Sequence, residues 1–254
     1  MISLAGKAAL VTGGSRGIGA ATVKLFAQAG ADVVFSYNRN RAAAGQVEQE
    51  ARKQGTRIES LKADLGRMAD AKRLVGHAVE RLGRIDILVA NAGIWNTVEA
   101  PIEKLTEREW DEMVRVNLKS VYDVVHFAAA PMIAQRSGRI IGISSASGQR
   151  GEAFHSHYGA TKGAIISFIK GLSTELAPHN ILVNCVAPGW VDTDISRPVL
   201  ATKEGAKLLA ASVPLRRAGK AEEVAGAILF LASDLATFIT GEVLNVNGGA
   251  VLCG

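Results

Sequence analysis

The sequence predicts one α/β domain in which a parallel β-sheet is covered by helices on both faces. Short runs rich in β-branched residues alternate with longer helical patterns along the whole chain, and no hairpin signal joins one run to the next. Strands buried on both faces of a parallel sheet form nearly continuous apolar runs, as these do. No linker, repeat or low-complexity tract interrupts residues 1–254, so a single doubly wound domain is expected.

The elements can be assigned in chain order from the periodicity of their apolar residues. The predicted strands are 8–12, 32–36, 57–63, 85–90, 139–144, 181–186 and 243–247. The predicted helices include 17–29, 41–54, 68–82, 107–136, 158–177 and 221–232. Thr106 and Glu109 have the spacing of a capping box, which marks the start of the fourth helix.

The second half of that fourth helix, SVYDVVHFAAAPMIA, is apolar nearly all round. Such a pattern predicts burial on two sides, one of them against the sheet. The other side would meet either a partner subunit or a further layer of the same chain.

Composition argues against several functional classes. The net charge is +5, but no dense Lys/Arg block or basic stripe with interleaved aromatic residues is present, so no nucleic-acid partner is expected. The longest apolar stretches, such as 223–233, are shorter than the about 18 residues that span a bilayer. Without a basic leader or cleavage site at the N-terminus, the expected location is cytoplasmic, with no membrane partner. Cys185 lies in an apolar run and Cys253 is next to last, so a disulfide framework is not expected.

The first predicted strand leads directly into TGGSRGIG. Its glycines lie where a strand turns sharply into a helix, and the free N–H groups and dipole of a helix N-terminus favour a phosphate. The spacing is T-G-x-x-x-G-x-G rather than G-x-G-x-x-G, and its place at the first strand–helix junction favours a dinucleotide over glycines that merely form a turn. The residues expected to contact the cofactor here are Thr12, Gly13, Ser15, Arg16, Gly17, Ile18 and Gly19.

The end of the second strand favours NADP(H) over NAD(H). A carboxylate about 20 residues after the glycine turn would hold the adenosine ribose 2′-hydroxyl. Tyr37 occupies that place instead, and Asn38 and Arg39 follow with no acidic residue before Arg41. A 2′-phosphate would meet the guanidinium groups of Arg39 and Arg16. The alternative is that Arg39 and Arg41 are ordinary surface charges at the start of a helix.

Further motifs follow the glycine turn along the chain. They are Asp64-Leu65, NAG at 91–93, Asn117, Ser145, the Tyr158/Lys162 pair and PGWVDT at 188–193. With these motifs and the glycine turn in this order, the chain resembles the short-chain dehydrogenase/reductase family along essentially its whole length. The resemblance implies an oxidoreductase of the Rossmann type, with a seven-stranded parallel sheet in the order 3-2-1-4-5-6-7. The cofactor would lie at the carboxyl ends of the strands.

The resemblance also implies roles for the cofactor-binding motifs. Asp64 is similar to the aspartate that accepts a hydrogen bond from the adenine amino group, although a plain helix cap is an alternative. Asn91 and Gly93 would lie beside the adenosine, and Thr193 would hold the nicotinamide carboxamide. The other cofactor contacts expected in these motifs are Leu65, Ala92, Tyr158, Lys162, Pro188, Gly189 and Val191.

Tyr158 and Lys162 are four positions apart on a predicted helix, so their side chains emerge on the same face. A phenol has an ordinary pKa of about 10, and a neighbouring ammonium is expected to lower the pKa of Tyr158. Tyr158 would then give a proton to a carbonyl oxygen during reduction and recover it during oxidation. The alternative is a packed tyrosine beside a surface lysine.

The remaining catalytic residues follow from the family pattern. Ser145 would hydrogen-bond the same carbonyl oxygen, and alternation along the strand should turn Ser144 to the opposite side. Asn117 would hold a water that links Lys162 to solvent. His155 and His157 are expected to line the substrate mouth, because two histidines without a matching carboxylate or thiol cluster do not indicate a metal site.

Within the family, the chain is most similar to 3-oxoacyl-[acyl-carrier-protein] reductases, through TGGSRGIG, NAGI and NVNGGA. This similarity implies reduction of an acyl-thioester or other small carbonyl substrate in a homo-oligomer, a tetramer by resemblance. Sugar, alcohol and hydroxysteroid dehydrogenases share the motifs and stay open, as does a non-catalytic NADP(H) sensor.

The substrate would meet a lid at about 194–217 and apolar walls made by Trp95, Phe154 and Trp190. Thr174 stands where reductases that dock the acidic carrier often have an arginine. Arg136 and the basic lid are possible substitutes for that arginine.

Overall fold

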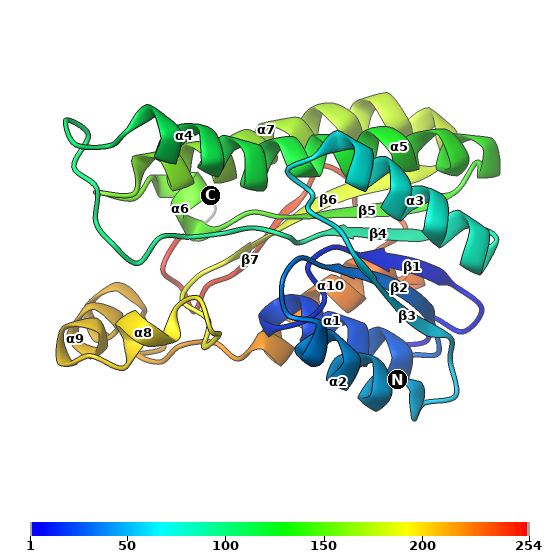
Figure 1. Cartoon of the computed structure of the whole chain (residues 1–254), viewed down its shortest axis with the longest axis horizontal. Coiled ribbons are helices and arrows are strands. Elements are labelled where there is room, and N and C mark those ends of the chain that lie inside the picture. Colours follow the sequence, from blue (N-terminus) through cyan, green and yellow to red (C-terminus); the bar gives the residue numbers. More distant parts are fainter. Residues whose placement is uncertain (1, 253–254) are drawn as a thin grey trace.

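The protein contains a seven-stranded parallel sheet in the order β3-β2-β1-β4-β5-β6-β7 (Figure 1). The computed structural model describes residues 2–252. The strands are β1 (Ala8–Val11), β2 (Asp32–Tyr37), β3 (Ile58–Lys62), β4 (Ile87–Ala90), β5 (Gly138–Ile143), β6 (Ile181–Pro188) and β7 (Val243–Val246). All seven predicted strands are present, and the strand order implied by the family resemblance is confirmed.

Helices cover both faces of the sheet (Figure 1). The longer ones are α1 (Gly17–Gln28), α2 (Arg41–Arg52), α3 (Met68–Leu82), α5 (Ser120–Gln135), α7 (Ser156–Leu176), α9 (Lys203–Ser212) and α10 (Ala221–Ala232). The shorter ones are α4 (Glu107–Met113), α6 (Ala146–Arg150) and α8 (Arg197–Leu200), with 3₁₀ turns η2 (Ala177–His179) and η3 (Asp234–Ala236). Helices α6, α8 and α9 were not predicted from the sequence.

Two apolar clusters, one on each face, hold the helices to the sheet. Phe26 of α1 and Ile228 of α10 belong to one cluster, and Leu74 of α3 and Ile169 of α7 belong to the other. Successive strand residues alternate between them, so that in β1 Ala9 and Val11 face the first cluster and Leu10 faces the second. This alternation explains why the central strands β1 and β4 are apolar at every position.

The helix predicted over 107–136 is interrupted. Its capping box at Thr106 and Glu109 is confirmed, but α4 gives way to a π-helical segment, η1 (Val114–Lys119), before α5 continues. Asn117 lies within η1 and is fully buried. Single π-helical turns inside longer helices occur often at functional sites, and this one lies beside the end of β4.

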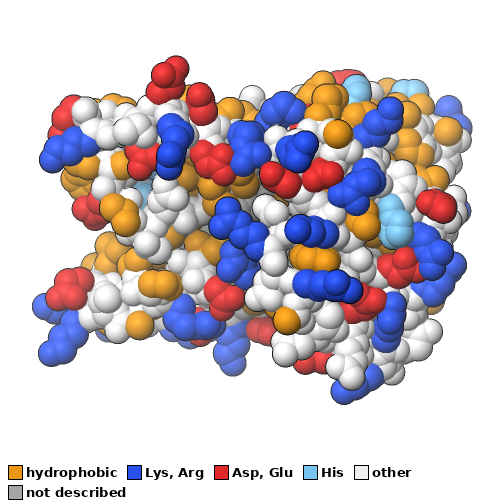
Figure 2. Space-filling model, viewed as in Figure 1, with side chains coloured by type: hydrophobic (Ala, Val, Ile, Leu, Met, Phe, Trp, Pro, Cys, Tyr) orange, Lys and Arg blue, Asp and Glu red, His pale blue; other side chains and the backbone are white. Residues whose placement is uncertain are grey.

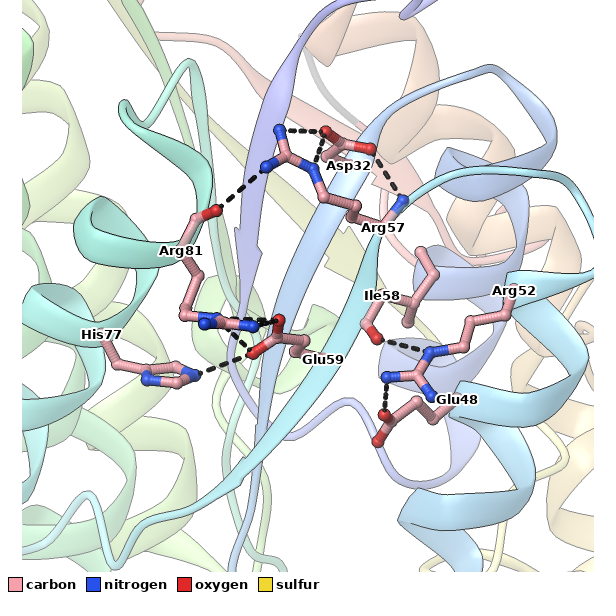
Figure 3. Close-up of polar contacts among 8 residues, drawn as sticks. All are labelled: Asp32, Glu48, Arg52, Arg57, Ile58, Glu59, His77 and Arg81. Atoms are coloured by element: carbon pink, nitrogen blue, oxygen red, sulfur yellow. Dashed lines mark hydrogen bonds and ion pairs between the residues drawn. The ribbon is translucent and has the colours of Figure 1, made fainter.

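The β3 edge of the sheet is covered by ion pairs (Figure 3). Arg81 of α3 and His77 both face the Glu59 carboxylate, at 2.6 and 3.4 Å. Arg57, directly before β3, forms an ion pair at 2.8 Å with Asp32 at the start of β2. Exposed pairs add little stability individually, but charged side chains along an edge strand discourage pairing with another chain.

Two further expectations concern the chain as a whole. Within residues 2–252, no helix is long and apolar enough to cross a membrane. Cys185 is buried in β6 with a free thiol, and Cys253 lies outside the described residues.

Candidate active site

A cavity of about 730 Å³ lies at the carboxyl ends of the strands. In Figure 2 it opens as a hollow between the part that carries α4 and α6 and the part that carries α8 and α9, with hydrophobic side chains on its walls. The predicted residues that line it are Gly13, Ser15, Arg16, Gly17, Ile18, Gly19, Tyr37, Asn38, Arg39, Asp64, Leu65, Asn91, Ala92, Gly93, Ser145, Tyr158, Lys162, Pro188, Gly189, Val191 and Thr193. Thr12 and Asn117 lie behind the wall.

The glycine turn is shaped by contacts with β4 and β6. Gly17 has φ +53°, and a Cβ there would lie 3.2 Å from Thr193 Cγ2. A Cβ on Gly19 would overlap the Gly13 carbonyl oxygen and lie 2.7 Å from Asn91 Nδ2. These close approaches require glycine, and without side chains at these positions the backbone at the start of α1 stays accessible from the cavity. A bare helix N-terminus of this kind fits the pyrophosphate of a dinucleotide.

Thr12 and Asn91 fix the turn against the end of β4. Thr12 Oγ1 accepts hydrogen bonds from the backbone N–H groups of Asn91 and Ala92, both at 2.9 Å. Asn91 Nδ2 donates to the Thr12 carbonyl oxygen at 2.8 Å. Thr12 therefore supports the cofactor turn from behind.

Arg16 and Arg39 are exposed side chains on the cavity wall. Among residues 2–252, neither forms an ion pair with an acidic side chain, whereas Arg115 on the same wall is paired with Glu112 at 2.7 Å. Two unneutralised guanidinium groups at the expected ribose end fit a phosphate rather than a hydroxyl. Arg41 does not line the cavity, which is consistent with an ordinary surface charge at that position.

Asp64 lines the same end of the cavity. Its carboxylate accepts a hydrogen bond from the Gly66 N–H at 3.1 Å and lies 3.6 Å from Arg115. Arg115, from η1, packs so closely that a Cβ on Gly66 would overlap its guanidinium. Arg115 could not be predicted from motif spacing, because its approach to Gly66 depends on the π-helical turn.

Tyr158, Lys162 and Ser145 come together as the motif predicts. Lys162 Nζ lies 5.8 Å from the centroid of the Tyr158 ring and donates to the Ile143 carbonyl oxygen at 2.8 Å. Ser145 Oγ accepts a hydrogen bond from the Ser147 N–H at 3.1 Å. Ser144 also lines the cavity, but its Oγ donates to the Lys162 carbonyl oxygen at 2.7 Å.

The expectation that the pKa of Tyr158 is lowered is wrong for the protein without a cofactor. Burial raises the pKa of Tyr158 to about 12, with the Glu152 charge adding to the rise and a hydrogen bond with Ser145 opposing it. Burial also lowers the pKa of Lys162 to about 8. Desolvation disfavours the charged form of each group and is the largest cause of both shifts.

Asn117 ties η1 to the chain that follows β4. Its Oδ1 accepts from the Ile94 N–H at 2.7 Å, and its Nδ2 donates to the Ile94 carbonyl oxygen at 2.9 Å. A Cβ on Gly93 would lie 3.1 Å from Asn117 Oδ1 and 3.5 Å from Lys162 Nζ. Asn117 thus borders Lys162 without reaching the cavity surface.

The substrate end of the cavity is aromatic. Trp95 and Trp190 line it and meet edge to face with centroids 5.7 Å apart. His155 stacks on Trp95 at 5.0 Å but is buried, as is His157. The expectation that the histidines line the mouth is therefore wrong. Phe154 is also not part of the wall, because its left-handed backbone (φ +61°) leaves its side chain 50% exposed outside the cavity.

The predicted lid contains α8 and α9, beyond the carboxyl ends of the strands (Figure 1). Arg197 of α8 pairs with Asp192 and Asp194, each at 3.0 Å. Trp95 and Trp190 line the wall as expected, and residues on the wall that were not predicted include Asn96, Glu112, Arg115, Ser147, Arg150 and Glu152. Asn96 and Glu152 come from loops, where side-chain direction depends on backbone turns that sequence spacing does not reveal.

Known proteins of similar sequence were found along nearly the whole chain. A family model described as "Enoyl-(Acyl carrier protein) reductase" matches residues 13–251. The chain is 40% identical to the 3-oxoacyl-[acyl-carrier-protein] reductase FabG of Chlamydia muridarum over 246 residues, which cover 97% of this chain and 98% of that one. It is 39% identical to the same-named protein of Aquifex aeolicus, over 98% of both chains.

Solved structures with a similar fold also cover nearly the whole chain. A short-chain dehydrogenase from Burkholderia cenocepacia in complex with NADP superimposes with a TM-score of 0.90 and 34% identity, covering 97% of this chain and 98% of that one. A mutant short-chain dehydrogenase/reductase from Serratia marcescens gives a TM-score of 0.91 and 36% identity, over 97% and 98% of the two chains.

Proposed function

The chain belongs to the short-chain dehydrogenase/reductase family, and from that membership we propose that it reduces the ketone of 3-oxoacyl thioesters with NADPH. The observation that carries the proposal is the placement of Ser145 and Tyr158 on one cavity wall with the glycine turn. The curated relatives named for 3-oxoacyl reduction span nearly the whole chain, which favours this substrate class over sugars, simple alcohols and steroids.

The chemistry divides between cofactor and protein. A bound nicotinamide dinucleotide supplies the hydride. Tyr158 OH carries the proton that the carbonyl oxygen gains, and Ser145 OH hydrogen-bonds the same oxygen as negative charge develops on it. Lys162 keeps a cationic amine beside the phenol, held by the Ile143 carbonyl. Two hydroxyls directed at one oxygen support reduction of a ketone rather than of the carbon–carbon double bond named in the family-model description.

A panel of neutral substrates tests the proposal. With NADPH, a 3-oxoacyl thioester should be reduced with a higher kcat/KM than a 2-enoyl thioester, a ketosugar or a steroid ketone, followed by loss of NADPH absorbance. Faster reduction of the enoyl thioester would favour the enoyl reductase description instead. NADPH binding with no turnover of any substrate would favour the non-catalytic sensor.

We further propose a preference for NADPH, supported by Arg16 and Arg39 on the wall, neither of which has an acidic ion-pair partner within residues 2–252. Arg39→Ala should raise the KM for NADPH about tenfold or more, because a hydrogen bond to a charged group contributes roughly 1.5–3 kcal/mol. The KM for NADH, which lacks the phosphate, should stay within about twofold.

Arg41→Ala is the matched control, since Arg41 is an exposed neighbour outside the cavity. It should leave both KM values near those of the unmodified enzyme. Equal KM values for NADPH and NADH in the unmodified enzyme would contradict the assigned role of Arg39.

Assembly into a homo-oligomer, a tetramer by family resemblance, is also part of the proposal. Its support is the outer surface of α5 and α7, where Tyr122 is 43% exposed and its ring centroid lies 6.5 Å from that of Phe168. An apolar surface shared by two long helices is suited to a second copy of the chain. Docking of the acyl carrier has weaker support, because Thr174 uses its hydroxyl on the Gly171 carbonyl of its own helix.

A further inference from the structure

A carboxylate stands on the cavity wall at the substrate end. Glu152 follows the short helix α6 and the left-handed Gly151 (φ +75°). Its side chain is only 18% exposed, and it lines the cavity together with Ser145, Tyr158 and Trp190. A partly buried carboxylate beside reacting groups is costly unless neighbouring groups hold it, so its partners indicate whether it is fixed there.

Glu152 is held from two sides. Ser147 Oγ donates to Oε2 at 2.6 Å, and His155 Nδ1 lies 3.7 Å from Oε1. Ser147 also donates its backbone N–H to Ser145 Oγ at 3.1 Å. One residue therefore connects the carboxylate to the serine expected to bind the carbonyl oxygen. The position of Glu152 is set by the same short helix as that of Ser145.

The negative charge of Glu152 is largely uncompensated. Arg150 lines the same cavity, but among the described residues no ion pair joins it to Glu152. Lys162 directs its amine to the Ile143 carbonyl oxygen, and His155 is cationic only when protonated. The charge reaches the reacting phenol, since Glu152 contributes to the raised pKa of Tyr158. Charges act more strongly in such a partly enclosed site than in water.

We propose that Glu152 is a specificity-determining residue that excludes substrates carrying a carboxylate near the reacting ketone. The inference rests on the proposed ketone reduction and deepens it. A 3-oxoacyl thioester and the corresponding free 3-oxo acid share the ketone, but in the free acid a negative charge lies two carbons away. That charge would stand close to Glu152 whenever the ketone meets Tyr158, and like charges in one site weaken binding. Esters and thioesters carry no such charge.

The test compares a matched pair of substrates, ethyl acetoacetate and acetoacetate, in the unmodified enzyme and in Glu152→Gln. Glutamine preserves the shape and still accepts the Ser147 hydrogen bond, but it is uncharged. The ratio of kcat/KM for the ester to that for the acid should fall about tenfold or more. The change should come from improved use of acetoacetate, with the ester affected less.

Two further variants separate charge from geometry. Ser147→Ala removes the hydroxyl that holds Glu152 but keeps the charge, so the ratio should fall less than in Glu152→Gln. Glu103→Gln removes an exposed charge from the loop that follows Trp95 and should leave the ratio in place. An equal fall in Glu103→Gln would overturn the assignment to the Glu152 charge.

The remaining outcomes distinguish this inference from the proposed function. If the ester is reduced and Glu152→Gln leaves the ratio unchanged, the specificity role is wrong and ketone reduction stands. If the thioesters and acetoacetate esters are not reduced by any form of the protein, the proposed function itself fails. Preferential use of acetoacetate by the unmodified enzyme would contradict the exclusion directly and point to Arg150 as an anion-binding residue.

Discussion

Replacing Tyr158 with phenylalanine should lower kcat for ketone reduction by roughly 10²–10⁴-fold, the range that a positioned general acid contributes. The ring would keep its place on α7, but no proton donor would face the carbonyl oxygen except Ser145. Affinity for NADPH should change little, because the Tyr158 hydroxyl is one of many expected cofactor contacts, and the glycine turn and Arg39 are untouched. Steady-state kinetics and a fluorescence titration with NADPH would measure the two quantities separately.

Tyr122→Phe provides the same chemical change at an exposed position on α5 and should leave kcat near its original value. Retention of more than about a tenth of kcat in Tyr158→Phe would show that Tyr158 is not the general acid. Loss of NADPH affinity together with kcat would instead indicate a damaged cavity.

Replacing Gly19 with alanine should reduce kcat/KM about a hundredfold and lower the free energy of unfolding by about 1–3 kcal/mol. The new methyl group would overlap the Gly13 carbonyl oxygen and press against Asn91 Nδ2. Both are parts of the turn that faces the cavity, so relief of the clash must displace the backbone that would hold the pyrophosphate. Denaturant unfolding and NADPH titration would measure the two effects.

Gly45→Ala is the matched control for this substitution. Gly45 lies inside α2, and a Cβ there meets nothing within 4 Å. Alanine should therefore stabilise the protein by roughly 0.5–1 kcal/mol through helix propensity and leave cofactor binding in place. Equal behaviour of the two alanine variants would show that the tight approach at Gly19 is not needed.

Much of the fold follows from the sequence because a parallel sheet leaves a strong signal. Its central strands β1 and β4 are apolar at every position, and alternating residues enter different clusters, as Ala9 and Leu10 do. The interruption of the helix over 107–136 has no such signal. A π-helical turn keeps the apolar pattern nearly unchanged, and it shows only in the contacts of Asn117 with Ile94.

The site was predictable where chemistry requires a fixed spacing. Residues of the glycine turn and the Tyr158/Lys162 pair line the cavity as expected. Loop residues were not predictable in the same way, because the left-handed backbone at Phe154 turns its side chain out of the cavity. The rise in the pKa of Tyr158 was also not predicted. It depends on how completely packing removes water from the hydroxyl, and the spacing of residues in the sequence does not reveal this.

The high pKa of Tyr158, about 12 in the protein alone, makes the two directions of catalysis unequal. Ketone reduction starts from the protonated phenol, the form that burial favours, whereas alcohol oxidation needs the phenolate, the form that burial disfavours. The rate of oxidation should therefore climb as the medium becomes alkaline, and the rate of reduction should depend less on pH. A single crowded hydroxyl would then make the two directions respond differently to pH.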